Sequence, residues 1–280
     1  MKIKFLGGVR TVTGTCCHIT INGLQALVDC GMYQGENAED VNKTPFSFIP
    51  SEISYIFLTH AHIDHSGLLP RVVREGFSGK IITTDATADL AEIMLYDSAQ
   101  IQQKDAEWLI KKALRKGVEP DMKPLYTTAD VNKTLSLFRR IAYLKTEHLG
   151  SGLKCRFLDA GHILGSGSLE LIYQDSAKEK TIVFSGDIGK KGNPIMNDPQ
   201  TPASADYIVM ESTYGNRNHR GMKESIDELA EAIRTTFKKG GNVLIPAFAI
   251  GRTQDILYTL NKFIKEKRFE TLNVYVDSPL

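Results

Sequence analysis

The chain has 280 residues, of which 42% are hydrophobic and 24% are charged, and this composition excludes a disordered chain. Lys and Arg number 34 against 33 Asp and Glu, so the net charge of +1 excludes a uniformly basic nucleic-acid-binding surface but is compatible with a local basic groove. No apolar run reaches about 18 residues, which excludes a transmembrane helix. The N-terminus lacks the apolar stretch of a secretory signal, and the four cysteines form no CxxC pair. We therefore expect a cytoplasmic protein with reduced thiols and no membrane partner.

The first part of the chain predicts a run of strands that gives way to helices. Thr84 is the expected N-cap of a helical stretch over 85–117, which should bend or break because few globular helices are so long. Thr127 and Asp130 predict a capping box for a helix that runs to residue 144. The elements expected before Thr84 are strands over 2–6, 17–21, 24–29, 53–58 and 80–83, and a helix over 66–75.

The second part of the chain returns to strands and then alternates helix and strand. A segment over 193–204 with three prolines is typical of a connection between two parts. We therefore predict an α/β chain with a layered αββα sandwich over 1–205, followed by the start of a parallel α/β domain over 206–280. The expected elements are strands over 153–158, 168–173, 181–184, 207–210, 242–245 and 272–276, and helices over 223–238 and 253–265.

The strongest chemical signal is a cluster of three histidines and one aspartate directly after the predicted strand over 53–58. Imidazole nitrogens and carboxylate oxygens are ligands of the kind that zinc prefers. His60 and His62 lie two residues apart, so in extended backbone they point the same way and can share one metal. Asp64 and His65 follow where the chain turns into a helix, and they could face a second metal about 4 Å away. The alternative interpretation is a polar turn that binds metal only adventitiously.

Two further strand ends supply candidate ligands. His162 follows a predicted strand and is flanked by small residues that permit close approach of the backbone to a site. Asp187 ends another strand in a tight glycine turn, from which its carboxylate could bridge two metals. Each residue alone is as readily explained by a structural turn. In combination with the histidine cluster, the two residues predict a two-metal site.

In their order and strand-end positions, these residues resemble the metallo-β-lactamase-fold hydrolases. The resemblance rests on His60-x-His62-x-Asp64-His65 together with His162 and Asp187. It implies that the αββα sandwich is the metallo-β-lactamase fold. It also implies that His60, His62 and His162 hold one zinc ion, that Asp64 and His65 hold another, and that Asp187 bridges them. Asp29 is similar to an early aspartate that orients the histidine loop in this family, although a turn-capping role is equally open.

Three later segments resemble the β-CASP group of nucleases within that family, in which a second α/β domain is inserted. These segments are residues 211–217, 243–254 and 274–280. The Glu at position 211 and the Gly-Arg pair are more similar to the RNA-processing branch than to the DNA-repair branch. The resemblance gives Glu211 a role in protonating the leaving group, and Gly251 and Arg252 at a predicted helix start could bind phosphate. A surface carboxylate at 211 and a solvated Arg at 252 are the alternatives.

In the family, later histidines complete the second metal shell and assist the catalytic glutamate, and both follow the inserted domain. None of the 7 histidines of this chain lies in that context, and the final strands of the sandwich are absent by residue 280. The sequence is therefore expected to be the N-terminal portion of a longer protein. Two zinc ions are expected in the complete protein, with the second site lacking one ligand here.

Our leading hypothesis is a zinc-dependent ribonuclease for RNA processing or decay. It would hydrolyse phosphodiester bonds of single-stranded RNA with a hydroxide that bridges two metals, and Asp64, Asp187 and Glu211 would be its catalytic residues. A hydrolase of thioesters or small esters on the same fold is the first alternative. An RNA-binding fragment with little activity is the second. A homodimer is compatible with each of these functions.

Overall fold

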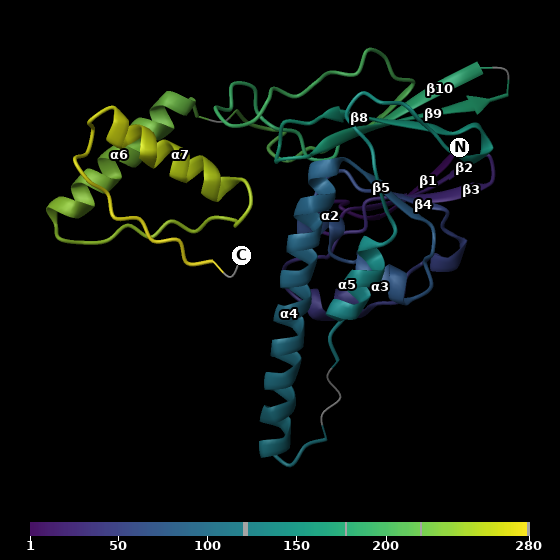
Figure 1. The fold of residues 1–280 in the computed structure, drawn as a ribbon, viewed down its shortest axis with the longest axis horizontal. Helices are drawn as coiled ribbons and strands as arrows, with labels where there is room; N and C mark the ends of the chain where they lie inside the picture. Colours follow the sequence, from purple (N-terminus) through teal and green to yellow (C-terminus); the bar gives the residue numbers. More distant parts are fainter. Residues whose placement is uncertain (120–122, 177, 219, 279–280) are drawn as a thin grey trace. The chain divides into compact units, whose positions relative to one another are not determined.

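The computed structural model describes residues 1–119, 123–176, 178–218 and 220–278. The chain forms two compact units, Met1–Glu211 and Ser212–Leu280. All the strands of the described residues belong to the first unit (Figure 1). In the described part of the chain, no helix combines the length and the apolar character needed to cross a bilayer.

The first unit begins with a six-stranded sheet in the order β1-β2-β3-β4-β5-β6. The first three strands pair antiparallel, and the pairs from β3 to β6 are parallel. The parallel strands therefore end at one edge of the sheet, where functional loops collect. The strands are β1 (Lys2–Gly7), β2 (Cys16–Ile21), β3 (Leu24–Val28), β4 (Tyr55–Phe57), β5 (Lys80–Thr83) and β6 (Phe138–Arg140).

A second sheet of five strands follows in the order β11-β10-β9-β8-β7. Because β8 and β10 each pair antiparallel with β9, while β11 is parallel to β10, the strands β8, β10 and β11 all end at the same edge. The strands are β7 (Glu147–His148), β8 (Lys154–Asp159), β9 (Gly167–Asp175), β10 (Lys178–Phe184) and β11 (Tyr207–Val209).

The two sheets pack face to face through one apolar core. Phe57 and Ile82 of the first sheet belong to the same buried cluster as Phe157, Leu169 and Phe184 of the second. Inward-facing residues alternate along the strands, as expected for a sheet with one buried face. This two-sheet core confirms the predicted sandwich.

Helices of the first unit follow the strands of the six-stranded sheet (Figure 1). Helix α4 runs without interruption for 31 residues, so the predicted bend or break is wrong. Thr84 caps it as predicted, accepting a hydrogen bond from the Thr87 amide, and neither Gly nor Pro interrupts the run before Gly117. The helices are α1 (Ala38–Lys43), α2 (Ile63–Ser66), α3 (Leu69–Arg74), α4 (Asp85–Arg115) and α5 (Thr128–Leu135), with short 3-10 turns at Pro50–Glu52 and Gly150–Gly152.

Two predicted helices have different bounds in the structure. The predicted capping box of Thr127 and Asp130 is confirmed, but α5 ends at Leu135 rather than at residue 144. The residues after it form β6, because pairing with β5 satisfies their backbone groups. The single helix predicted over 66–75 is replaced by α2 and α3, which Gly67 and Leu68 separate.

The second unit contains helices α6 (Met222–Lys238) and α7 (Arg252–Lys265). They pack through Ala230, Ile233, Leu260 and Phe263. The predictions of strands over 242–245 and 272–276 are wrong, because neither segment pairs with a strand among the described residues. Without a ladder partner an apolar run gains little from extension, and Leu244 stays 93% exposed.

Candidate metal centre

The histidine loop leaves the end of β4 and is held by a buried aspartate from the end of β3. Asp29 is 1% exposed and lies in the left-handed region with φ 59°. Its Oδ1 accepts a 2.8 Å bond from the Thr59 amide, and its Oδ2 accepts a 2.8 Å bond from the Thr59 hydroxyl. Oδ2 also lies 2.8 Å from Nδ1 of His65. Asp29 therefore binds both the start and the end of the loop.

Backbone contacts from the segments beside β2 and β3 hold the helix that carries Asp64 and His65. The Thr15 amide donates to the Asp64 carbonyl at 2.8 Å, and the Cys30 amide donates to the His65 carbonyl at 2.8 Å. Gly31 lies so close that a Cβ there would be 1.6 Å from the Asp64 carbonyl oxygen. Only glycine fits this approach.

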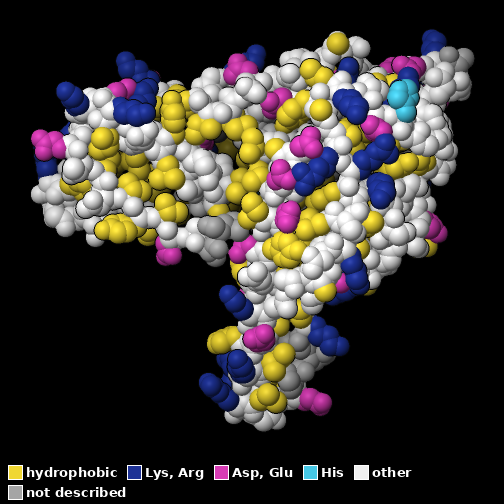
Figure 2. All heavy atoms as spheres, in the orientation of Figure 1, with side chains coloured by type: hydrophobic (Ala, Val, Ile, Leu, Met, Phe, Trp, Pro, Cys, Tyr) yellow, Lys and Arg dark blue, Asp and Glu magenta, His cyan; other side chains and the backbone are white. Residues whose placement is uncertain are grey.

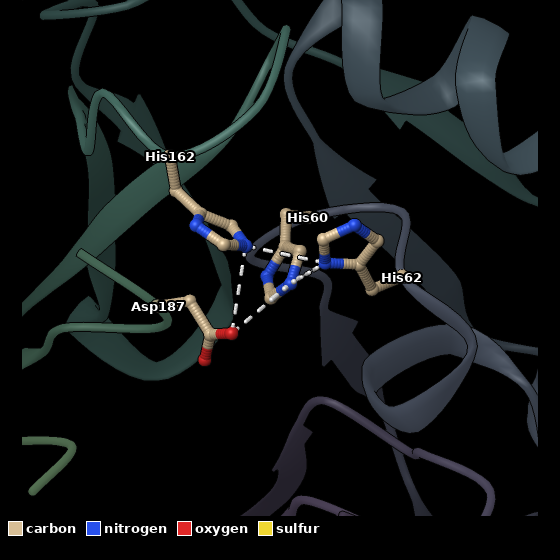
Figure 3. A group of neighbouring side chains, drawn as sticks. All are labelled: His60, His62, His162 and Asp187. Atoms are coloured by element: carbon tan, nitrogen blue, oxygen red, sulfur yellow. Dashed lines mark hydrogen bonds and ion pairs between the residues drawn. The ribbon is translucent and has the colours of Figure 1, made fainter. Parts of the chain in front are cut away.

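Three imidazoles converge at the mouth of this loop (Figure 3). Nε2 of His60 lies 3.1 Å from Nδ1 of His62, and Nε2 of His162 lies 3.2 Å from the same Nδ1. One ligand atom from each imidazole and one carboxylate oxygen of Asp187 all lie within 4.8 Å of one another. The structure thus brings together four of the predicted metal ligands from three separate strand ends.

The spacing of these nitrogens fits a metal ion. Zinc binds imidazole nitrogen at about 2.0–2.1 Å in tetrahedral sites, which places neighbouring ligand atoms about 3.3 Å apart. The two nitrogen separations of 3.1 and 3.2 Å, both from Nδ1 of His62, match this ligand–ligand edge. A set of three imidazoles and one carboxylate is also a donor set that zinc prefers.

Asp187 connects this group to a second one. Its Oδ2 faces His60 and His162 at 3.8 and 3.5 Å, whereas its Oδ1 lies 3.2 Å from Nε2 of His65. The same His65 nitrogen lies 3.9 Å from Oδ2 of Asp64. The two oxygens of Asp187 therefore face two different sets of side chains, which is the arrangement that a bridging ligand requires.

The protonation of these side chains suits metal ligation at the first group. Burial, followed by the neighbouring imidazole of His65, holds the pKa of His60 well below its usual range. Burial and the imidazole of His162 lower the pKa of His62. Both imidazoles are therefore neutral near pH 7, as metal ligands must be.

Protonation differs at the second group, which consists of Asp64, His65 and the facing oxygen of Asp187. Burial alone would lower the pKa of His65, but the charge of Asp29 and hydrogen bonds with Asp187 raise it well above the usual range. Burial raises the pKa of Asp64. Burial opposes ionisation of Asp187, yet its hydrogen bond with His65 lowers the pKa overall. A cation at this group would displace a proton from His65.

Glu211 is the last residue of the first unit, and its side chain contacts the loop that follows β10 and carries Asp187. Its Oε1 accepts a 2.7 Å bond from the Ile188 amide, and its own amide donates to the Ser185 hydroxyl at 3.1 Å. Glu211, the predicted proton donor, is thus hydrogen-bonded to the backbone directly after Asp187.

The remaining predicted residues lie in the second unit. Gly251 is the N-cap of α7 with φ 88°, and Arg252 is the first helical residue and is exposed. Residues 274–278 of the last resembling segment have no regular structure, and Pro279 and Leu280 lie outside the described residues. His219, which the sequence predicts to be a loop residue, is also outside them.

Sequence reasoning missed several side chains that hold the loops. Thr59 binds Asp29 twice, as described above. Asp159 accepts a 2.9 Å bond from the Gly161 amide and a 3.1 Å bond from the Asn197 side chain, which fixes the loop that carries His162. An Asp at a strand end, three residues before a His, was the available signal for Asp159.

Comparisons with known proteins agree with this fold and site. The sequence profile of the metallo-beta-lactamase superfamily matches residues 14–246. The chain is 36% identical to Ribonuclease TTHA0252 of Thermus thermophilus over 280 residues, which are 100% of this chain and 59% of that protein. It is 28% identical to Transcription termination factor FttA of Methanosarcina mazei, with 99% of this chain and 42% of that protein covered. It is 29% identical to Endoribonuclease YSH1 of Yarrowia lipolytica, with 92% and 29% covered. The chain thus spans 59% or less of the length of these relatives.

Proposed function

Because this chain belongs to the metallo-beta-lactamase superfamily, we propose that it is a metal-dependent hydrolase that cleaves phosphodiester bonds in single-stranded RNA. The observation that carries the proposal is the convergence of three imidazole nitrogens on one point, with Asp187 turned towards a second group. The names of the relatives, Ribonuclease TTHA0252 and Endoribonuclease YSH1, support RNA as the substrate.

The donor set supports zinc as the metal. His60, His62 and His162 would hold one ion, and Asp64 and His65 would hold the other, with Asp187 shared between them. When bound, such ions lower the pKa of water towards about 7 and neutralise charge on a phosphate.

The chain's own residues orient these ligands and handle protons. Asp29 keeps a proton on Nδ1 of His65, so that the proton displaced by a cation would leave Nε2, whose lone pair would then face the site. Glu211 holds the backbone after Asp187 through the Ile188 amide and keeps its other oxygen for a proton to the leaving oxygen. Gly251 and Arg252 at the N-terminus of α7 would bind a phosphate of the strand.

The similarity of residues 211–217, 243–254 and 274–280 to the β-CASP group supports placing the protein in that RNA-processing group. We assign 1–205 to the catalytic sandwich and 206–280 to the start of the inserted domain, whereas the second compact unit begins at Ser212. A cytoplasmic location is also part of the proposal and is supported by an RNA substrate. A homodimer remains part of the proposal, with the molar mass in solution as its test.

The test is incubation of the chain with end-labelled single-stranded RNA and zinc. The proposal expects cleavage that a chelator abolishes and that Asp187→Ala abolishes without loss of fold. Cleavage that survives both treatments would contradict it. A chromogenic ester serves as the control substrate, because turnover of the ester without cleavage of RNA would favour the small-ester hydrolase instead.

A further inference from the structure

Helix α4 extends beyond the core that its first half helps to build (Figure 1). Its buried residues are confined to Thr87, Ala88, Ala91, Leu95 and Ala99. From residue 100 to its end, no residue of α4 is buried. We call residues 101–115 the α4 arm. Gln102 and Gln103 at its base accept hydrogen bonds from the Leu125 and Thr128 amides, but the arm adds no buried side chain to the core. Packing therefore does not account for this extension.

One face of the α4 arm is basic. At 100° per residue, positions 101, 104, 108, 111, 112 and 115 fall within one sector of about 120°. All six side chains are exposed, and Asp105 is the one acidic residue in that sector. Figure 2 shows dark-blue basic side chains beside yellow apolar ones on this projecting end. The basic members of the face are Lys104, Lys111, Lys112 and Arg115.

The centre of this face is an exposed indole. Trp108 is the single tryptophan of the chain, and it is 58% exposed. The ammonium of Lys112 lies 4.6 Å from its ring centroid, so a cation already sits against the aromatic system. Cationic side chains around an accessible aromatic ring are the combination that binds single-stranded nucleic acid, because phosphates pair with the cations and bases stack on the ring.

Two ordinary explanations account for less of this face. The helix dipole favours basic residues in the last turn, which covers Lys112 and Arg115 but not Lys104. Pairing with a second copy would need apolar residues at every third and fourth position. The seam through Ile101 and Trp108 instead meets lysines or aspartate at 104, 105, 111 and 112, and these would repel their counterparts.

We propose that the α4 arm binds the single-stranded RNA substrate, with Trp108 stacked on a base and the basic side chains of the face paired with phosphates. The inference rests on the proposed function, because it takes RNA as the substrate.

The root of α4 lies beside the metal centre. The hydroxyls of Thr84 and Thr87 donate to the Gly165 carbonyl at 2.6 and 2.7 Å, three residues after His162. Trp108 follows Thr84 by 24 residues, which is about 36 Å of helix. Roughly ten stacked nucleotides span this distance. The α4 arm therefore binds long substrates and leaves short ones unaffected.

The single tryptophan provides a direct readout. The protein with chelator is titrated with a uridylate oligomer of about 30 nucleotides, and the intrinsic fluorescence is followed. We expect the emission of Trp108 to be quenched in step with binding measured by anisotropy of a labelled oligomer. Binding by anisotropy with unchanged tryptophan emission would overturn the proposal.

Variants separate stacking from charge. Trp108→Leu keeps an apolar side chain but has no ring, and it should weaken binding of the long oligomer about tenfold. Replacing the four basic residues by Ala should lower the slope of log K against log salt by about 3, from roughly 0.7 per phosphate contact. The matched control replaces four exposed lysines outside α4, namely Lys2, Lys4, Lys80 and Lys145. An equal loss in the control, or none in Trp108→Leu, would overturn the proposal.

The outcomes distinguish this inference from the proposed function. If zinc-dependent cleavage occurs and the fluorescence of Trp108 does not change with RNA, the nuclease proposal stands and the arm proposal fails. If Trp108 responds to RNA and no cleavage occurs with metal, the arm proposal stands and the nuclease proposal fails. Cleavage of an oligomer of about five nucleotides, too short to reach Trp108, should be the same in the Trp108→Leu variant as in the unmodified chain, and a loss there would also count against the arm.

Discussion

Asp29→Asn should separate the two halves of the metal centre. The Thr59 amide can only donate, so the Asn oxygen must stay where Oδ1 of Asp29 accepts that bond. The new NH₂ group then takes the place of Oδ2, facing the Thr59 hydroxyl and Nδ1 of His65. Nδ1 must become an acceptor, which moves the ring proton to Nε2. Nε2 is the nitrogen that faces Asp64 and Asp187, so His65 can no longer offer a lone pair there.

The expected magnitudes differ between stability and metal binding. Asn leaves no buried donor without an acceptor, since the Thr59 hydroxyl can accept from the new NH₂ group. The loss of one charge-assisted bond should cost about 1.5–3 kcal/mol of unfolding free energy. Asp29→Ala leaves the Thr59 amide and Nδ1 of His65 without an acceptor, and should lower the unfolding free energy by about 3–5 kcal/mol. For the proposed two-ion site, affinity for the ion at Asp64 and His65 should fall about 10–100-fold in Asp29→Asn, while the ion proposed at His60, His62 and His162 is retained.

The assay is a zinc titration by calorimetry, combined with urea unfolding of the metal-free proteins. The matched control is Asp130→Asn, which replaces another buried carboxylate, in the capping box of α5. The control should lose stability and keep both metal affinities. If Asp29→Asn binds both ions as tightly as the unmodified chain, the tautomer argument is wrong.

Three other perturbations test separate parts of the structure. Glu211→Gln keeps an oxygen for the Ile188 amide, so it should retain zinc stoichiometry and lose RNA cleavage; if cleavage stays normal, Glu211 is not the acid. Gly31→Ala should cost about 3 kcal/mol or more and weaken zinc binding, whereas Gly150→Ala, where a Cβ meets only the Tyr55 hydroxyl oxygen at an ordinary contact distance of 3.9 Å, should be neutral in the same urea and zinc titrations. Burial raises the pKa of the Cys17 and Cys155 thiols to about 12, from an ordinary value near 9. The stability they contribute is complete below about pH 9 and is lost as the pH rises through about 12, roughly 1.4 kcal/mol for each thiol by pH 10; a pH-independent urea midpoint between pH 8 and 10 would contradict this.

The sequence predicted what short spacing and strand ends reveal. His60, His62, Asp64 and His65 stand together in the chain, so their association needed no long-range information. The sequence also indicated the two sheets, because period-2 alternation marks a half-buried strand.

Tertiary partners decided what the sequence left open. Residues 138–140 joined β5 as a strand although their local pattern favours helix. Residues 242–245 are as apolar as a central strand but pair with nothing in the described residues. Thr59 carries no signature of its own, since its role depends on the aspartate that the fold brings near it. Asp159 stands at a strand end before His162, but its role depends on which amides the fold brings near it. The straightness of α4 follows from a favourable residue at every turn, whereas the expected break came only from typical helix lengths.

Strand direction explains why distant residues meet at one place. Asp29 and His60 follow β3 and β4, which are parallel, and Asp187 and Glu211 follow β10 and β11, which are parallel as well. The carboxyl ends of each set therefore share an edge, and the 2.8 Å bond from the Gly167 amide to the Thr59 carbonyl joins the two edges. Figure 3 shows the result, with side chains from both sheets turned towards one point.

The same edge also begins α4, because β5 is parallel to β4 and ends directly before Thr84. Because the chain leaves this edge as one uninterrupted helix, the far end of α4 lies at a fixed distance from the candidate metal ligands. The distance of any α4 residue from the start of the helix at this edge is thus set by its position, at about 1.5 Å per residue. There is a minimum RNA length at which removal of the tryptophan weakens binding. If the α4 arm binds RNA, moving Trp108 by one turn along the same face should change this minimum length by about two nucleotides. A dependence on RNA length that does not move with the tryptophan would show that the helix does not set this distance.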